Sequence, residues 1–139
     1  MRRTRTSAAL ASAEAMPAES NTRSAGARYE ELALDHLRGA GLTLIECNYT
    51  CRYGEIDLVM RERETVVFVE VRYRRSNAFG GGIDSVNAAK RAKLVRAARA
   101  FLAGHPRLAD STCRFDVVAI GDEARAPSID WRRNAFEAC

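Results

Sequence analysis

Residues 54–60 read Gly54-Glu55-Ile56-Asp57-Leu58-Val59-Met60, and residues 66–72 read Val66-Val67-Phe68-Val69-Glu70-Val71-Arg72. Each run is rich in β-branched and apolar residues and carries acids inside it, so the two runs predict a β-hairpin. Successive side chains of a strand point to opposite faces of the sheet. The pattern therefore predicts two sets that each share a face: Glu55, Asp57 and Val59 on the first strand, and Val66, Phe68, Glu70 and Arg72 on the second.

The short charged segment between the two strands sets their expected register. If this turn leaves Glu62 opposite Thr65, Asp57 lies directly across from Glu70. Opposed Cβ atoms in an antiparallel pair are about 4.5–5.5 Å apart, and two carboxylates at that separation repel unless a positive charge lies between them. A divalent cation with oxygen ligands is one solution. The alternative is that each acid lies on the solvated face of a half-exposed strand, although their apolar neighbours make that arrangement costly.

Length and composition limit the class of protein. A chain of 139 residues with 47% hydrophobic residues predicts one globular domain with a real core. The net charge of +4 is only mildly basic, so the clustering of charge matters more than its sum. Residues 1–25 are rich in Ala, Ser and Arg and poor in large apolar residues. We expect a disordered extension over 1–25, with an organellar presequence as the alternative, and an ordered domain over 26–139.

The cysteines and the hydropathy pattern carry expectations about the compartment. Cys47 and Cys51 form a C-x3-C pair without a second pair at metal spacing or a nearby His, so a zinc site is not predicted. Reduced thiols in the cytoplasm are the expected state. No apolar run approaches the roughly 18 residues of a membrane span, so we expect no membrane partner.

Periodicity predicts the remaining elements. Apolar residues at helical spacing predict a helix over 28–38 that Gly39 or Gly41 ends, and a second helix capped by Asp84 or Ser85 that runs to about Gly104. Strands are predicted over 42–50, 54–60, 66–74 and 115–120, followed by a terminal segment over 129–136. The order α-β-β-β-α-β predicts an α/β fold, in which a mixed β-sheet is flanked by helices.

Two cations accompany the acids of the hairpin. Arg72 follows Glu70 by two residues and is expected on the same face, where it either neutralises Glu70 or steadies a phosphate group beside a metal. Lys90 lies on the apolar stripe of the second helix. It either extends its ammonium group to the rim of the core or assists directly at the site.

Further basic residues surround these elements. Arg74 and Arg75 continue the second hairpin strand, while Arg91 and Lys93 lie on the second helix. Together they are candidates for a nucleic-acid-binding groove, with an ordinary solvated helix face as the alternative. The segment Phe79-Gly80-Gly81-Gly82 lacks a following Gly-Lys-Ser/Thr and is expected to be a connector. The tyrosines and Trp131 show no stacking pattern in the sequence.

Several segments together resemble the YraN family of bacterial proteins, which is related to archaeal Holliday-junction resolvases. Within these segments, an acid on one strand is followed on the next strand by Glu70-Val71-Arg72, which is similar to Glu-x-Lys. This arrangement resembles the PD-(D/E)xK nuclease pattern. The match runs in order over about residues 26–136. Its segments are Gly26-x-x-x-Glu30, Gly54-Glu55-Ile56-Asp57-Leu58, Phe68-Val69-Glu70-Val71-Arg72-Tyr73-Arg74, Phe79-Gly80, Lys90, Arg114-Phe115-Asp116-Val117-Val118 and Asn134-Ala135-Phe136.

This resemblance implies a restriction-endonuclease-like fold in which Asp57 and Glu70 are metal-binding acids and Glu30 is an additional acid. Arg72 stands where the nucleases usually have Lys, and arginine does not give up its proton. Arg72 would neutralise developing charge, with Lys90 as a helper.

The implied function is Mg²⁺- or Mn²⁺-dependent hydrolysis of DNA phosphodiester bonds, with selectivity for branched DNA as one form of it. Resolution of a four-way junction would require a homodimer. The alternatives are a non-catalytic nucleic-acid-binding module of the same fold and a purely structural or protein-interaction domain. Metal-dependent cleavage separates the first two, and salt-sensitive DNA binding separates both from the third.

Overall fold

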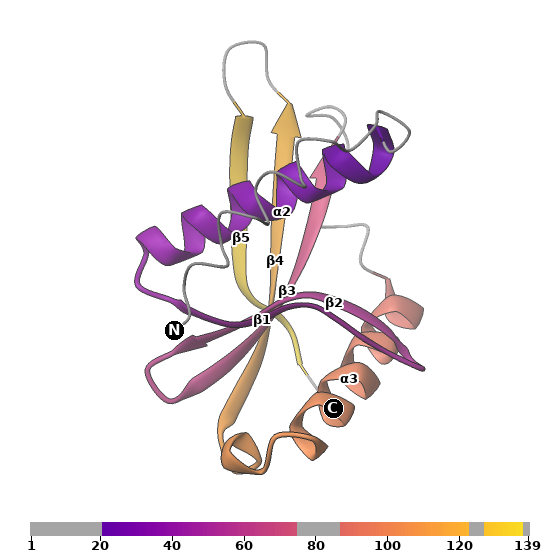
Figure 1. The fold of residues 1–139 in the computed structure, drawn as a ribbon, viewed down its shortest axis with the longest axis vertical. Coiled ribbons are helices and arrows are strands. Elements are labelled where there is room, and N and C mark those ends of the chain that lie inside the picture. Colours follow the sequence, from indigo (N-terminus) through magenta and orange to yellow (C-terminus); the bar gives the residue numbers. More distant parts are fainter. Residues whose placement is uncertain (1–20, 75–86, 123–126, 138–139) are drawn as a thin grey trace, which may run out of the picture.

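The computed structural model describes residues 21–74, 87–122 and 127–137. The chain forms a mixed α/β fold in the order helix, three strands, helix and two strands (Figure 1). Its elements are helix α2 (Asn21–Gly39), strands β1 (Thr43–Cys51), β2 (Gly54–Glu62) and β3 (Thr65–Arg74), helix α3 (Ala88–Ala103), the short 3₁₀ helix η3 (Pro106–Leu108), and strands β4 (Thr112–Asp122) and β5 (Pro127–Phe136). The predicted α-β-β-β-α-β order is confirmed and continues into β5, and the arrangement is consistent with a restriction-endonuclease-like fold.

The five strands form one sheet in the order β1-β2-β3-β4-β5. All neighbouring pairs are antiparallel except β3 and β4, which are parallel. Parallel neighbours need a long crossover connection, and here the chain between β3 and β4 includes α3. In Figure 1, β1 and β2 run across the direction of β3, β4 and β5.

The register between β2 and β3 explains this divergence. Glu62 pairs with Thr65, as predicted, and the ladder continues to Leu58 opposite Val69. Pairing stops there, although β2 begins earlier, at Gly54, and β3 runs on to Arg74. Beyond this point β2 pairs with β1, while β3 pairs with β4. The next two residues in the register are Asp57 and Glu70, so the predicted acid pair lies where the two strands part.

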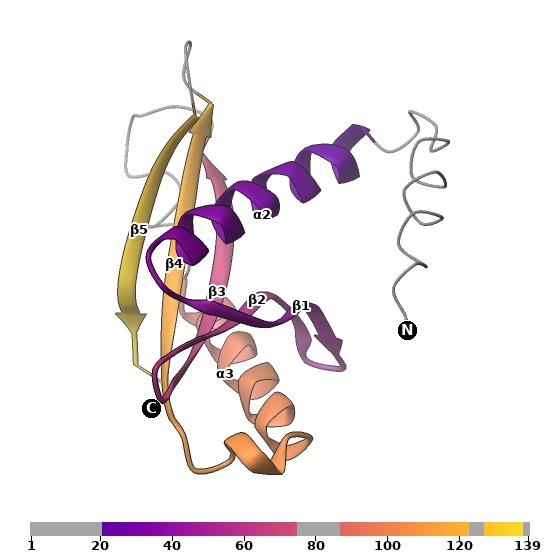
Figure 2. The same ribbon diagram turned by 60° about the vertical axis from the view of Figure 1, so that its left-hand side comes forward.

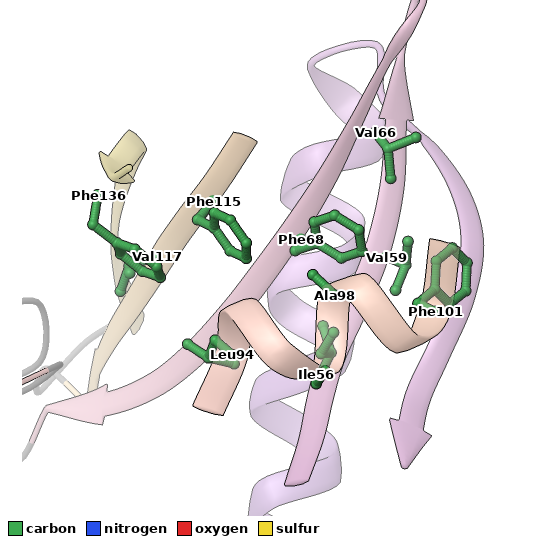
Figure 3. Close-up of a cluster of buried hydrophobic side chains, with 11 residues drawn as sticks. Ile56, Val59, Val66, Phe68, Leu94, Ala98, Phe101, Phe115, Val117 and Phe136 are labelled. Carbon is green, nitrogen blue, oxygen red and sulfur yellow. The ribbon is translucent and has the colours of Figure 1, made fainter. Parts of the chain in front are cut away.

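The two helices cover opposite faces of the sheet, and β3 contributes to both cores by alternation. Val66 and Phe68 pack with α3, while Val67 and Val69 pack with α2. Figure 3 shows the α3-side core, where Phe68 lies between strands and helix. Figure 2 shows α2 crossing the strands obliquely. Burial of one such aliphatic or aromatic side chain stabilises the fold by about 1.5–3 kcal/mol, so these clusters hold both helices firmly.

Alternation fails on β2, where the acids lie. Ile56 and Val59 belong to the same α3-side core although they are three positions apart, and Leu58 belongs to the α2-side core. The predicted common face of Glu55, Asp57 and Val59 is therefore wrong for Val59, whereas the carboxylate oxygens of Glu55 and Asp57 lie within 4.8 Å of each other. The strand turns over near Asp57, and the Asp57 carboxylate accepts a hydrogen bond from the Val71 amide of β3 at 2.8 Å.

The helix ends also differ from the predicted ones. Asn87, not Asp84 or Ser85, caps α3, because its side-chain oxygen accepts the Lys90 amide at 2.9 Å. Positions 84 and 85 lie outside the described residues, as does the segment 79–82. Helix α2 begins at Asn21, ahead of the predicted domain start at residue 26, and ends at Gly39 as expected.

The described part of the chain also bears on the cysteines and on membrane crossing. Cys47, Cys51 and Cys113 are free cysteines there. Neither described helix combines the length and the apolar character that crossing a membrane requires.

Asp116 on β4 is a fully buried carboxylate with a structural role. Arg114 donates to both of its oxygens at 2.9 and 3.1 Å. The Trp131 indole and the Asn134 amide of β5 each donate at 2.9 Å. Asn134 has a positive φ of 50°, and the β4–β5 register shifts between Phe115 and Val117. Asp116 therefore holds a β-bulge together, and four donors offset the cost of burying its charge.

We predict that Asp116→Asn lowers the free energy of unfolding by about 3 kcal/mol, because an amide group would face the donors of Arg114, Trp131 and Asn134. The measurement is urea denaturation with an unchanged m-value. Asp130→Asn on β5 is the matched control, since Asp130 is exposed and lies 3.9 Å from Arg74. It should change stability by less than about 0.5 kcal/mol. Equal effects of the two substitutions would contradict the role assigned to Asp116.

Candidate metal centre

Three carboxylates converge where β2 leaves β3. Glu30 of α2 and Glu55 and Asp57 of β2 each offer an oxygen, and these oxygens all lie within 4.8 Å of one another. Glu55 is exposed, whereas Glu30 and Asp57 are half-buried. The carboxylates form a cluster open to solvent on one side, and a hard divalent cation prefers such oxygen donors. We call Glu30, Glu55 and Asp57 the carboxylate cluster.

Hydrogen bonds from neighbouring strands fix two members of the cluster. Asp57 is held by the Val71 amide at 2.8 Å. Glu30 Oε1 accepts a hydrogen bond from the Asn48 side-chain amide at 3.2 Å, which joins α2 to β1. Asn48 has a positive φ of 55°, a conformation that asparagine adopts more easily than most residues. Sequence reasoning missed Asn48, since nothing in β1 alone indicates its contact with α2.

The cluster is electrostatically strained without a cation. Burial, followed by the charge of Glu70, raises the pKa of Asp57 to about 7, and Glu30 and Glu55 add to the effect while the Val71 amide opposes it. Burial and the neighbouring charges of Glu55 and Glu70 also raise the pKa of Glu30. A divalent cation would favour the ionised form of every member. The donor set and its electrostatics therefore fit an Mg²⁺ or Mn²⁺ ion.

Glu70 lies beside the carboxylate cluster but outside it. Its side chain is 6% exposed, and its Oε2 is 3.2 Å from Arg72 Nη1 and 3.4 Å from Lys90 Nζ. Arg72 was expected either to neutralise Glu70 or to steady a phosphate group, and the structure contains the pairing with Glu70. Lys90 also reaches this carboxylate, so its ammonium group does more than extend to solvent. The charge of Glu70 still acts on Asp57 and Glu30, which places it close to both.

The sequence-predicted basic residues separate into different places. Lys93 lines a small hollow of about 40 Å³ together with Glu55 and Lys90, so it lies beside the cluster. Arg91 lies on another side of α3, with its guanidinium 5.3 Å from the centre of the Phe136 ring. The side chain of Arg74 contacts β5, where its Nη2 donates a hydrogen bond to the Ser128 hydroxyl at 3.1 Å. Arg75 lies outside the described residues.

A larger groove lies along α3 beside the end of β5. It encloses about 740 Å³ and carries three arginines and an apolar floor near the end of β5. We call it the α3 groove; its lining includes Arg91, Arg96, Arg99, Val95 and Phe136. Of the predicted nucleic-acid-binding residues, Arg91 lines this groove, whereas Lys93 lines the small hollow beside Glu55. The groove concentrates positive charge on the helix that also carries Lys90 and Lys93.

The chain matches a known family over the elements that build this site. Residues 29–120 match the family described as "Uncharacterised protein family UPF0102". The chain belongs to the UPF0102 family. This is the YraN family that the motifs resemble, so that recognition is confirmed. The matched range includes the carboxylate cluster, Glu70 and its two cations.

Relatives in the UPF0102 family match most of the chain. The UPF0102 protein of Stutzerimonas stutzeri (strain A1501) is 53% identical over 119 residues, which is 86% of this chain and 99% of that protein. The UPF0102 protein of Nitrosomonas europaea is 53% identical over 112 residues, 81% of this chain and 92% of that protein. That of Pseudomonas entomophila (strain L48) is 50% identical over 114 residues, 81% of this chain and 93% of that protein.

We predict that Asp57→Asn stabilises the metal-free protein at neutral pH. The native pKa of about 7 exceeds the ordinary value of 3.8, so the native state keeps a proton that the unfolded chain has lost. The stability that this carboxyl contributes is complete below pH 3.8 and is lost as the pH rises through about 7. Asparagine does not titrate, and its carbonyl oxygen can still accept the Val71 amide.

The measurement is the melting temperature in EDTA across this pH range. The melting temperature of Asp57→Asn should rise relative to that of the wild type as the pH increases. Asp35→Asn, at an exposed position of α2, should keep the melting temperature of the wild type at every pH. Added Mn²⁺ should stabilise the wild type more than Asp57→Asn, because a bound ion favours the native state. A wild type and an Asp57→Asn variant with parallel pH curves would argue against the strained carboxylate.

Proposed function

We propose that this UPF0102 protein is a divalent-metal-dependent endonuclease that hydrolyses phosphodiester bonds in DNA. The observation that carries the proposal is the convergence of Glu30, Glu55 and Asp57 within 4.8 Å beside the basic face of α3. Oxygen-rich donor sets of this kind suit Mg²⁺ and Mn²⁺. The choice of DNA rests on the family resemblance, and the cytoplasm is the proposed place of action.

The carboxylate cluster would bind the metal ion in this proposal. Glu30, Glu55 and Asp57 would hold the ion, which when bound supplies Lewis-acid stabilisation of phosphate charge and acidifies a bound water. The Val71 amide fixes Asp57, and the Asn48 amide fixes Glu30, so two ligands are oriented before the substrate arrives. Preorganised charges lower the barrier more than mobile ones, because they need not rearrange during the reaction.

Cations around Glu70 and Glu55 would receive the substrate backbone. Lys93 and Lys90 line the hollow beside Glu55 and can approach a phosphate from the side opposite α2. Arg72 remains charged and so acts as an electrostatic stabiliser rather than as a base. In this proposal Glu70 acts mainly by holding Arg72 and Lys90 in place.

The α3 groove would extend the contact with nucleic acid beyond the cleaved bond. Arg91, Arg96 and Arg99 present three cations along one helix, a spacing that suits successive phosphates. Such contacts position the nucleic acid but carry little sequence information. We therefore expect recognition of DNA structure more than of base sequence.

A non-catalytic nucleic-acid-binding module is the second candidate. The pairing of Glu70 Oε2 with both Arg72 and Lys90 favours it, because two cations already occupy an acid that the resemblance assigns to the metal. Arg72 in place of the usual lysine favours it as well. Both candidates use the same basic surface, and they differ in metal-dependent cleavage.

The deciding experiment offers labelled linear, flapped and four-way DNA to the protein with Mg²⁺, Mn²⁺ or EDTA. We predict cleavage with either metal and none in EDTA. Glu55→Gln and Asp57→Asn should each lower the single-turnover rate by about 10²-fold or more, the scale of losing one electrostatic stabiliser. DNA affinity should change little, because the cations of α3 remain.

Glu31→Gln provides the matched control for these substitutions. Glu31 is exposed on α2 beside Glu30 and is not a member of the carboxylate cluster. It should cleave at the wild-type rate. Wild-type cleavage by purified Glu55→Gln and Asp57→Asn would contradict the site. DNA binding without cleavage under any metal would replace the nuclease by the second candidate.

A further inference from the structure

Two tyrosines stack at the end of the α2 face. The rings of Tyr29 on α2 and Tyr73 on β3 lie 4.8 Å apart between centroids, with planes 13° from parallel. Among the residues that the structure describes, Tyr73 is the one large hydrophobic residue that is exposed, at 43%. The sequence showed no stacking pattern among the tyrosines, and the structure corrects that expectation. We call this pair the tyrosine stack.

Two independent links place the tyrosine stack beside the carboxylate cluster. On α2, Tyr29 directly precedes Glu30, a member of the cluster. On β3, the Val71 amide binds the Asp57 carboxylate at 2.8 Å, and Tyr73 is the next residue on the same face. Two residues of a strand span about 6.6–6.8 Å. The same two elements thus bring both the acids and the rings together.

Packing against the core explains the position of Tyr29 but not that of Tyr73. Tyr29 packs against the α2-side core, as does Val71 one strand repeat before Tyr73. Tyr73 lies past the end of that core, and 43% of its surface remains exposed. With one ring face directed at Tyr29, it extends the core into a flat aromatic surface at the rim of the site.

We infer that the tyrosine stack receives an unpaired nucleobase next to the scissile phosphate. This inference rests on the proposed function for the nature of the ligand. A base in a continuous duplex is already stacked on its neighbours, whereas a base at a flap, junction or frayed end can stack on an aromatic side chain. The substrate class is therefore DNA with unpaired nucleotides near the cleavage point. The rest of its backbone would follow the cations of α3.

The test compares Tyr73→Leu with Tyr73→Phe and the wild type, since leucine keeps an apolar contact but removes the ring. Binding to a short single-stranded oligodeoxynucleotide and to a duplex of the same sequence is measured by fluorescence anisotropy in EDTA. Tyr73→Leu should lose about 5- to 150-fold in affinity for the single strand. Its affinity for the duplex should remain that of the wild type, and Tyr73→Phe should bind both as the wild type does.

A second measurement needs no variant. An oligodeoxynucleotide with 2-aminopurine at an unpaired position should lose fluorescence when the wild-type protein binds, because stacking on an aromatic ring quenches this base. Unchanged fluorescence on binding would overturn the inference. Equal losses for single strand and duplex in Tyr73→Leu, or no loss for either, would overturn it as well.

These readouts separate the tyrosine stack from the nuclease. Because binding is measured in EDTA, selective loss of single-strand affinity in Tyr73→Leu supports the stack even if no DNA is cleaved. Conversely, a wild type and a Tyr73→Leu variant that cleave flapped and linear DNA with identical preferences would retain the nuclease and remove the stack from substrate recognition.

Discussion

The hydrogen bond from the Val71 amide to the Asp57 carboxylate, 2.8 Å long, joins the sheet at the point where it divides. The backbone ladder between β2 and β3 ends at Leu58 and Val69, so the strands beyond it have no shared backbone pairing. In a continued ladder, a backbone carbonyl would accept the hydrogen bond of the neighbouring strand. Here the carboxylate of Asp57 accepts it in place of a carbonyl. The acid therefore connects the two parts of the sheet and is fixed in position by that connection.

The division of the sheet also divides the charges. On the α2 side, Glu30 and Glu55 gather around Asp57. Burial, followed by the charges of neighbouring carboxylates, raises the pKa of the half-buried Asp57 and Glu30. On the other side, Glu70 is paired with Arg72 and Lys90. Acids that need a cation and cations that can receive a phosphate thus lie next to each other. This arrangement suits the proposed metal-assisted phosphate chemistry, and it costs stability, because buried carboxylates are unfavourable unless they are compensated.

Much of this arrangement follows from local sequence. The short turn after Glu62 sets the register with Thr65, and the apolar alternation of β3 fixes which residues face each helix. Asp57 and Glu70 were recognisable as candidates, because acids within apolar runs need a reason to be there, whereas Glu30 was named only through the family resemblance.

The rest depends on contacts between distant segments. The sequence does not say where the β2–β3 ladder ends, and this endpoint decides that Glu55 joins the cluster while Glu70 turns to Lys90. The path of α2 across the sheet decides that Tyr29 meets Tyr73. Neither feature has a local signal, since both arise from how the helices pack on a twisted sheet. The site is thus assembled by tertiary structure from residues that sequence reasoning could name only in part.

The most direct test of the central claim is a crystal structure of the protein with Mn²⁺, solved with anomalous scattering data to locate the ion. The account predicts an anomalous peak among the carboxylates of Glu30, Glu55 and Asp57, with at least two of them as ligands and Glu70 still paired with Arg72 and Lys90. A fully occupied ion elsewhere, or crystals in saturating Mn²⁺ without a peak at these carboxylates, would contradict it.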